Sequence, residues 1–285
     1  MSTWSTNSII RHAVAETPEG PFQKKEVVMP AFAHNPTALR APDGTYLIYH
    51  IGCGNGRPGY PPCTDCSGGV SSKTCAGPGE QNGCTKTTTN ILHSTSLDGP
   101  WQQLDANFTN SATMTWPGFD NPTVTFFPNG SLLGLSRGGV LSREASSDGV
   151  VTAPSWKGPY TFHSQVGNSS SPSVEDPFVW QDRRGNFHAL FHKFTDETPN
   201  CGGHAYSQNG MDWILTNEPA YQTTIATADG AEHPFTRRER PHLLFDDKTG
   251  QIPIVLYTTL TQWSTSGAND GHDKAFTFAQ PIATF

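Results

Sequence analysis

Acidic residues recur in this chain one or two positions before prolines that lead into apolar segments, and we call each such tripeptide a head. Three such heads are Asp120-Asn121-Pro122, Glu175-Asp176-Pro177 and Glu239-Arg240-Pro241, and a fourth, His34-Asn35-Pro36, has histidine and asparagine at the same places. Carboxyl groups brought together can cleave a glycosidic bond, because a protonated one donates to the leaving oxygen while an ionised one attacks carbon or activates water. The candidate catalytic residues are therefore Glu239, Asp176 and Asp120.

Other polar residues of the heads, and one aromatic residue nearby, could bind the substrate of such a site. They are Asn35, His34, Asn121, Arg238, Arg240 and Trp180. Structural explanations compete with these assignments. Asp before proline is common in turns, Glu239 could pair with its neighbouring arginines, and Trp180 could pack between elements instead of stacking on a sugar. Because side chains alternate along a strand, we expect Glu175 to point away from Asp176.

The apolar segments after the heads predict how these groups are positioned. Each runs through a turn that contains Gly or Asn into a second apolar segment, which is a β-hairpin pattern. Positions 35, 121, 176 and 240 mark a unit of roughly 50–60 residues once an insertion at 53–86 is set aside, and this is the size of a four-stranded propeller blade. Since the first strands of successive blades surround one axis, we expect the heads to converge on it.

A second repeated pattern lies between the heads. Ser96–Trp101, Pro154–Tyr160 and Ser207–Trp213 each place a glycine turn before an aromatic residue. We interpret them as hairpins between the third and fourth strands of a blade. On this interpretation the aromatic side chain packs against the neighbouring blade.

Composition favours an all-β fold in a single domain covering residues 1–285. Gly (28) and Pro (23) are plentiful and charged residues make up only 15% of the chain, a balance typical of turn-rich β proteins. The net charge of −7 argues against a nucleic-acid partner, because phosphate contacts need clustered Lys and Arg. No apolar run reaches the ~18 residues of a membrane span. We expect a monomer.

The ends of the chain favour five blades over four. Residues 9–15 and 20–22 resemble the third and fourth strands of a blade, and residues 274–279 resemble a third strand of the last blade. The N-terminal pieces could complete that last blade and close a four-bladed ring. They supply a whole half-blade, however, whereas a single strand usually closes a ring. We therefore expect a five-bladed β-propeller whose first half-blade is missing from this chain.

The insertion at 53–86 is rich in cysteine, with Cys53, Cys63, Cys66, Cys75 and Cys84. Its Cys-Thr-Asp-Cys spacing is that of a zinc ligand pair, and the remaining thiolates could complete the site. Disulfides are the favoured alternative, because N-glycosylation sequons at Asn107, Asn129 and Asn168 suggest a secreted glycoprotein. We expect an extracellular location, although this chain has no cleavable signal peptide.

Two heads in their wider context resemble a known family. Val174-Glu-Asp-Pro-Phe-Val-Trp180 and Arg237-Arg-Glu-Arg-Pro-His242 are similar to heads of the five-bladed β-propeller glycosidases, which include glycoside hydrolase family 43 and the related invertases and levansucrases. The resemblance implies that Asp176 binds the sugar and stabilises the transition state, and that Glu239 is the general acid. The family's third carboxylate, a base or nucleophile, belongs on the first blade, where this chain has Asn35.

The resemblance further implies a glycoside hydrolase that binds an oligo- or polysaccharide in the axial funnel. No cofactor is required, although a structural Ca²⁺ or other cation could bind near the axis. The alternative function is a carbohydrate-binding propeller without turnover, which asparagine at position 35 would permit. The sequence leaves the sugar and the anomeric outcome open.

Overall fold

The computed structural model describes residues 8–30, 33–52, 89–109, 120–137, 148–167, 173–194, 201–227, 229–262 and 274–282. These ranges contain strands and no helix, and within them no helix is long and apolar enough to cross a membrane. The cysteine-rich insertion at 53–86 lies outside the described residues. Its zinc and disulfide interpretations therefore stay predictions.

Three four-stranded antiparallel sheets follow one another, each with its strands in sequence order. The first contains β3 (Ala33–Arg40), β4 (Tyr46–Gly52), β5 (Thr89–Ser94) and β6 (Gln102–Asp105). The second contains β7 (Asp120–Phe126), β8 (Leu132–Arg137), β9 (Asp148–Ala153) and β10 (Thr161–Gln165). The third contains β11 (Ser173–Gln181), β12 (Phe187–Phe194), β13 (Cys201–Ser207) and β14 (Ile214–Leu215).

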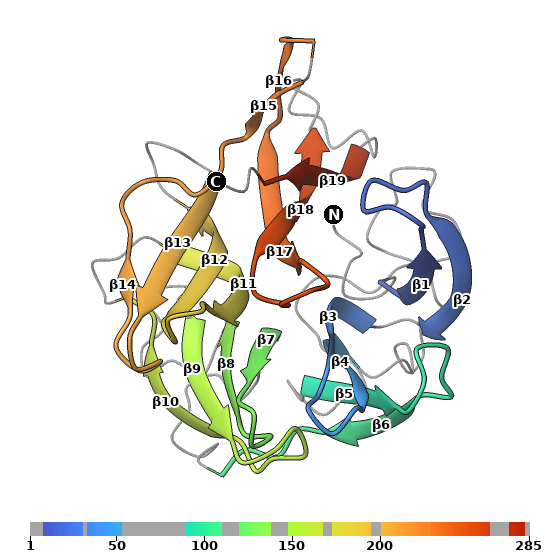
Figure 1. Ribbon diagram of the computed structural model, residues 1–285, viewed down its shortest axis with the longest axis vertical. Coiled ribbons are helices and arrows are strands. Elements are labelled where there is room, and N and C mark those ends of the chain that lie inside the picture. Colours follow the sequence, from blue (N-terminus) through green and yellow to red (C-terminus); the bar gives the residue numbers. More distant parts are fainter. Residues whose placement is uncertain are drawn as a thin grey trace, which may run out of the picture.

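Two smaller sheets and a hairpin make up the rest of the described chain. β17 (Arg237–Phe245), β18 (Pro253–Gln262) and β19 (Lys274–Pro281) form a three-stranded sheet. β1 (Ile10–Val14) and β2 (Gln23–Met29) form a two-stranded sheet. The hairpin of β15 (Thr224–Ala226) and β16 (Glu232–Pro234) projects from the outside of the molecule (Figure 1).

The sheets other than this hairpin are arranged radially, with β3, β7, β11 and β17 innermost (Figure 1). This is a β-propeller, as the sequence predicted. The β1–β2 sheet occupies a fifth position in the ring. Among the described residues neither of its strands pairs with β19, so the N-terminal strands do not complete the last blade. The four-bladed closure considered from the sequence is therefore not the arrangement found.

The hydrophobic core lies between neighbouring sheets. Tyr49 and Ile91 of the first four-stranded sheet pack with Val151 of the second, and Leu135 of the second packs with Phe191 of the third. Similar clusters join the β1–β2 sheet to the first of these sheets and the third to the β17–β19 sheet. Each fully buried side chain of this size stabilises the fold by about 1.5–3 kcal/mol. Packing between sheets thus fixes the geometry around the axis.

The glycine turns join the third and fourth strands, as predicted. Gly99 lies between β5 and β6, Gly158 between β9 and β10, and Gly210 between β13 and β14. The aromatic residue after the second of these turns reaches the neighbouring sheet. Tyr160 Oη lies 3.1 Å from Tyr49 Oη on β4, and the Tyr160 hydroxyl also donates to the carbonyl oxygen of Trp156.

Candidate functional site

Each head interrupts its strand with the same irregularity. In β3, His34 pairs with Ile51 and Thr37 with Tyr49, so one extra residue is accommodated between the two pairs. The same shift follows the first residue of the heads in β7, β11 and β17. The proline of each head has no N–H to give to the strand ladder, which favours a bulge at this point. A β-bulge redirects side chains out of the regular alternation.

The residue before each proline adopts a left-handed backbone conformation. The φ angle is 49° at Asn35, 49° at Asn121, 54° at Asp176 and 57° at Arg240. Asn and Asp tolerate this region, whereas a left-handed conformation costs other residues roughly 1–2 kcal/mol. Strained residues of this kind concentrate at functional sites. Their repetition around one axis marks the starts of these four strands as the candidate site.

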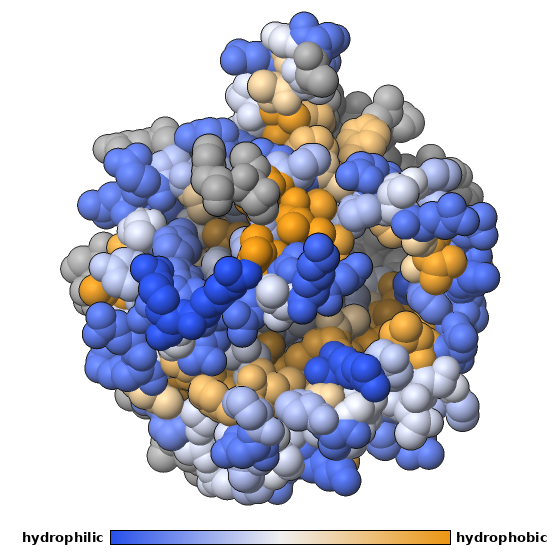
Figure 2. All heavy atoms as spheres, viewed as in Figure 1, coloured by the Kyte–Doolittle hydropathy of each residue, from blue (hydrophilic) through white to orange (hydrophobic). Residues whose placement is uncertain are grey.

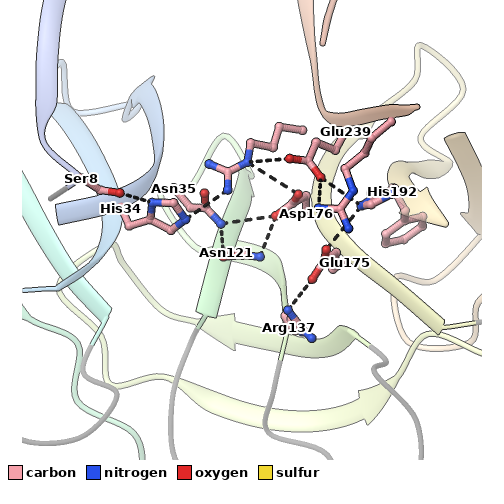
Figure 3. Close-up of polar contacts among 12 residues, drawn as sticks. Ser8, His34, Asn35, Asn121, Arg137, Glu175, Asp176, His192 and Glu239 are labelled. Atoms are coloured by element: carbon pink, nitrogen blue, oxygen red, sulfur yellow. Dashed lines mark hydrogen bonds and ion pairs between the residues drawn. The ribbon is translucent and has the colours of Figure 1, made fainter. Parts of the chain in front are cut away.

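The four side chains at these positions line one cavity, and Figure 3 shows Asn35, Asn121 and Asp176 pointing toward one another. Asn121 Nδ2 donates to Asp176 Oδ1 at 2.6 Å, and Asn35 Nδ2 donates to the same oxygen at 3.3 Å and to Asn121 Oδ1. Arg240 Nε lies 3.8 Å from Asp176 Oδ2. We call Asn35, Asn121, Asp176 and Arg240 the axial ring. The heads therefore converge on the axis.

Two further carboxylates and a histidine adjoin Asp176. One carboxylate oxygen from each of Glu175, Asp176 and Glu239 and one ring nitrogen of His192 lie within 4.8 Å of one another. Asp176 and Glu239 are only 8% and 4% exposed. The expectation that Glu175 points away from Asp176 is wrong. The bulge between Glu175 and Phe178 breaks the alternation, so both carboxylates face the same space.

The sequence analysis did not identify His192, which belongs to this cluster, or Arg137, which contacts it. His192 pairs across the strands with Glu175, and Arg137 pairs with Asp120. His192 Nδ1 lies 3.3 Å from Glu175 Oε1 and 3.6 Å from Glu239 Oε2. Arg137 Nη1 donates to Glu175 Oε2. Both could have been identified by pairing the two strands of each predicted hairpin, because each residue lies opposite the first residue of a head.

Asp176 and Glu175 are neighbours, but their surroundings shift their pKa values in opposite directions. Burial raises the pKa of Asp176 to about 6; Arg240 opposes this rise, while Glu175 and Glu239 add to it. Burial also acts to raise the pKa of Glu175, but the hydrogen bond with His192 and the charge of Arg137 hold it below its usual value. Glu175 is therefore ionised where Asp176 still holds a proton.

Arginines surround the third carboxylate of the cluster. Glu239 Oε2 lies 3.2 Å from Arg237 Nη1, and Glu239 Oε1 lies 4.0 Å from Arg240 Nε. The cluster of Glu175, Asp176, Glu239 and His192 offers a donor set that could hold a cation. The guanidinium groups already give Glu239 and Asp176 positive partners without an ion.

His34 contacts the axial ring through Arg240. His34 Nε2 lies 3.0 Å from Arg240 Nη2, and His34 Nδ1 lies 2.8 Å from Ser8 Oγ. Arginine can only donate, so Nε2 accepts and the ring proton is assigned to Nδ1. Burial, together with the charge of Arg240, lowers the pKa of His34 to about 3. This neutral imidazole therefore orients the guanidinium of Arg240.

Arg238 and Trp180, predicted to bind substrate, do not lie at the axial ring. Arg238 is buried in the last blade, where its Nε donates to Thr258 Oγ1 at 3.0 Å and its guanidinium stacks on Tyr221 at 4.7 Å. Trp180 lies near the far end of β11 and stacks on His188 at 5.2 Å. Both positions indicate packing. Asp120 begins β7, but its side chain lies outside the described part of the chain.

A further carboxyl group, Asp148, was also missed from the sequence. It pairs with Arg137 in β9 and is completely buried, and neither of its oxygens has a hydrogen-bond partner among the described residues. Burial and then the charge of Asp176 raise its pKa well above the usual value. Asp148 therefore adds to the site's surroundings a carboxyl group that holds its proton more tightly than an ordinary aspartate does. An Asp-Gly pair in a sequence more often indicates a turn.

A small cavity of about 120 Å³ lies at the axial ring. It is lined by the ring and by residues that follow it in β3, β11 and β17: Asn35, Pro36, Thr37, Asn121, Asp176, Pro177, Phe178, Arg240, Pro241 and His242. Figure 2 shows hydrophilic residues over most of the outer edge of the molecule, and both hydrophobic and strongly hydrophilic residues toward the middle of the view. Within the described chain, Asn35 Oδ1 is buried without a hydrogen-bond partner. This oxygen can accept a hydrogen bond from a ligand hydroxyl.

No protein-family model and no curated protein matches this chain. Its structure is nevertheless similar to solved glycoside hydrolases. An endo-arabinase from Bacteroides thetaiotaomicron aligns with a TM-score of 0.55 at 12% identity over 100% of this chain and 97% of that one. A family 117 glycoside hydrolase from Zobellia galactanivorans aligns with a TM-score of 0.59 at 14% identity over 98% and 70%. A family 43 protein from Bacillus licheniformis aligns with a TM-score of 0.50 at 16% identity over 95% and 43%.

The structural neighbours are five-bladed β-propeller glycoside hydrolases of families 43 and 117 at low sequence identity. At these identities the similarity shows the fold. This chain spans less than two thirds of some of these proteins, covering 43% of the Bacillus licheniformis protein and 51% of an exo-β-1,3-galactanase from Clostridium thermocellum. The expected propeller fold is confirmed, and the function must be argued from the site.

Proposed function

We propose that this chain is a glycoside hydrolase that binds a glycan at the axial ring and protonates the leaving oxygen with the Asp176–Glu239 pair. The observation that supports this most is the approach of the two carboxyl groups to within 4.8 Å, with the pKa of Asp176 raised to about 6. Burial, with the nearby charges of Glu175 and Glu239, holds a proton at Asp176 that the pair can pass to a substrate. A protonated carboxyl group is what the departure of a sugar-linked oxygen requires.

In this proposal the two members of the pair have different roles. Glu239 delivers the proton, and Asp176 becomes the charge that stabilises the positive sugar ring in the transition state. Arg240 keeps Asp176 ionisable, since it is the main influence that lowers the pKa of that buried group. Asn35 Oδ1 accepts a hydrogen bond from a sugar hydroxyl. These roles follow from burial, charge and free hydrogen-bonding capacity at the ring.

The short separation of Asp176 and Glu239 excludes Asp176 as the base of an inverting reaction. An inverting acid and base stand about 6.5–9.5 Å apart to leave room for water, so Asp176 cannot be the base that accompanies Glu239. Asn35 and Asn121 are neutral amides and are poor bases. We assign water activation to Asp120, because it precedes Asn121 as Glu175 precedes Asp176 and Glu239 precedes Arg240.

The proposal is tested by measuring release of reducing sugar from arabinan, β-1,3-galactan and xylan. The first two probes are chosen because the neighbours include an endo-arabinase and an exo-β-1,3-galactanase. We expect wild-type hydrolysis of at least one polysaccharide, lost in Glu239→Gln and in Asp120→Asn. Glu232→Gln on the exposed β16 is the matched control and should retain the wild-type rate. Azide should restore turnover of an activated aryl glycoside in Asp120→Asn and give a glycosyl azide.

A second function, carbohydrate binding without turnover, is favoured by the two asparagines in the axial ring. Calorimetry with the same polysaccharides distinguishes the two functions. Saturable binding without hydrolysis of any probe would overturn the proposed enzyme and support the binding propeller. Full activity in Glu239→Gln would instead show that another group supplies the proton.

A further inference from the structure

A second cavity, of about 500 Å³, lies between the first two four-stranded sheets. Its wall includes Thr45, His93, Thr95, Gln102, Trp156 and Lys157. Ligand sites of proteins commonly have volumes of about 300–1,000 Å³ and combine an apolar surface with a few placed polar groups. We call this space the rim cavity.

The rim cavity is separated from the axial ring by the length of the strands. The ring residues stand near the starts of β3 and β7, whereas Thr45 follows the end of β3. β9 runs antiparallel to β8, which runs antiparallel to β7, so the turn after β9 with Trp156 is also at the opposite end. Both turns lie together at the rim in Figure 1. Along β3 the distance from Asn35 in the axial ring to Arg40 at the end of the strand is about 17 Å, at 3.3 Å per residue.

The floor of the rim cavity is held in place by contacts between the two sheets. Trp156 Nε1 donates to Asp43 Oδ2 at 3.0 Å, and the Trp156 ring lies 4.9 Å from the ring of His93. Trp156 is 6% exposed and belongs to the hydrophobic core. A floor anchored in this way does not have to be ordered when a ligand binds, which lowers the cost of binding.

The side chains above this floor suit a polyhydroxylated ligand. Thr95 and Gln102 are exposed and offer a hydroxyl and a carboxamide, which can each donate and accept hydrogen bonds. Burial, together with the charge of Lys157, lowers the pKa of His93, so its imidazole is neutral near pH 7 and can also donate and accept. Sugar hydroxyls need this mixture of donors and acceptors.

The charge of Lys157 indicates which class of sugar the rim cavity would bind. Among the described residues that line the rim cavity, Lys157 alone carries a formal charge at neutral pH. Within the described chain no carboxylate forms an ion pair with its ammonium group, which instead lies 5.1 Å from the centre of the Trp156 ring. Lys157 also interacts electrostatically with the Asp43 carboxylate that accepts from Trp156 Nε1, but Asp43 does not line the cavity. Lys157 is therefore the charge that the cavity presents to a ligand.

We propose that the rim cavity is a second carbohydrate-binding site, which takes a short oligosaccharide bearing carboxylate groups. A carboxylate of the ligand pairs with Lys157, and its hydroxyls bond to Gln102 and His93. This site goes beyond the proposed hydrolase function and does not depend on turnover at the axial ring. It would hold an acidic polysaccharide on the face of the propeller opposite that ring.

The test is calorimetric titration of the full chain with trigalacturonic acid, with β-1,3-galactotriose as the neutral comparison. We expect saturable binding of the acidic trisaccharide, at least 10-fold weaker in Lys157→Ala and weaker in Gln102→Ala. Lys24→Ala on the exposed β2 is the matched charge control and should bind as wild type does. Asp176→Asn at the axial ring should also leave this binding unchanged.

Four results would overturn the assignment. They are no saturable binding of trigalacturonic acid, equal loss in Lys24→Ala and Lys157→Ala, loss in Asp176→Asn with retention in Lys157→Ala, and neutral galactotriose that binds Asp176→Asn as tightly as the acidic sugar does. Thr95→Trp adds a test that does not depend on charge, because an indole at the mouth should block the cavity. Circular dichroism melting confirms that each variant is folded before its affinity is interpreted.

Discussion

Asp176 and Arg240 occupy equivalent positions in consecutive blades and face each other with opposite charge, Arg240 Nε lying 3.8 Å from Asp176 Oδ2. Both precede a proline, lie within the same kind of bulge and have a positive φ angle. The repeated backbone conformation thus determines where each side chain lies, and the residue type determines its charge and hydrogen-bonding groups. At the other two positions of the axial ring the same backbone presents the amides of Asn35 and Asn121.

This relationship predicts a pH effect for Arg240→Met. The guanidinium lowers the pKa of Asp176, while burial raises it to about 6. Removing the positive charge should therefore raise the pKa of Asp176 further, by about 1 unit or more. Carbon-13 NMR of labelled aspartate measures this directly. Arg40→Met, which changes an exposed arginine on β3, should leave the value unchanged, and a lower pKa in Arg240→Met would contradict the argument.

Asp176→Asn should have a higher free energy of unfolding than wild type, and this difference should grow as the pH rises. The pKa of Asp176 is about 6 in the folded chain against an ordinary 3.8, so the folded state binds this proton more tightly than the unfolded state. The cost of the buried charge is absent below about pH 4, grows up to about pH 6 and then stays constant. The gain over wild type should reach on the order of 3 kcal/mol above pH 6, because each unit of the pKa difference is worth about 1.4 kcal/mol.

Urea unfolding at pH 4, 5, 6 and 7 measures this gain. Asp247→Asn, which changes an exposed aspartate in the turn after β17, serves as the control and should show no comparable pH dependence. A gain that shrinks as the pH rises would show that Asp176 is stabilised as an anion.

The left-handed backbone of the axial ring predicts an unusual order of substitutions at Asn121. Asn121→Ala and Asn121→Gly both remove the 2.6 Å hydrogen bond to Asp176. Only alanine retains the steric cost of φ near 49°, so Asn121→Ala should be less stable than Asn121→Gly by about 1 kcal/mol. At Thr125, a regular position of β7, glycine should be the less stable of the two because it weakens strands. The same order at both sites would refute the strain argument.

The repeat of the heads was enough to predict the propeller and the convergence of Asp176 and Glu239. It succeeded because a polar head, a proline and an apolar strand are local features that each blade repeats. Glu175 was misjudged because strand alternation was applied across a bulge, and a bulge depends on pairing with β12. Pro177 was the available signal, since a proline inside an inner strand must interrupt the ladder.

Other residues could not be placed from the sequence because their environments come from distant segments. Arg238 lies beside Glu239 in the chain, yet it is held by Thr258, Gln280 and the ring of Tyr221, which depend on the packing of the last blade. Asp148 looks like part of a polar turn, and only the assembled ring buries it completely. Charge in the sequence therefore says little about function until burial is known.

Glu239→Gln should separate proton donation from binding. Loss of a general acid typically lowers a rate by about 10²–10⁴-fold, so polysaccharide hydrolysis should fall by that amount while the dissociation constant of the glycan changes little. A 2,4-dinitrophenyl glycoside needs no protonation of its leaving group and should be cleaved by Glu239→Gln at close to the wild-type rate. Equal losses on both substrates would mean that Glu239 maintains the geometry of Arg237 and Arg240 without donating a proton.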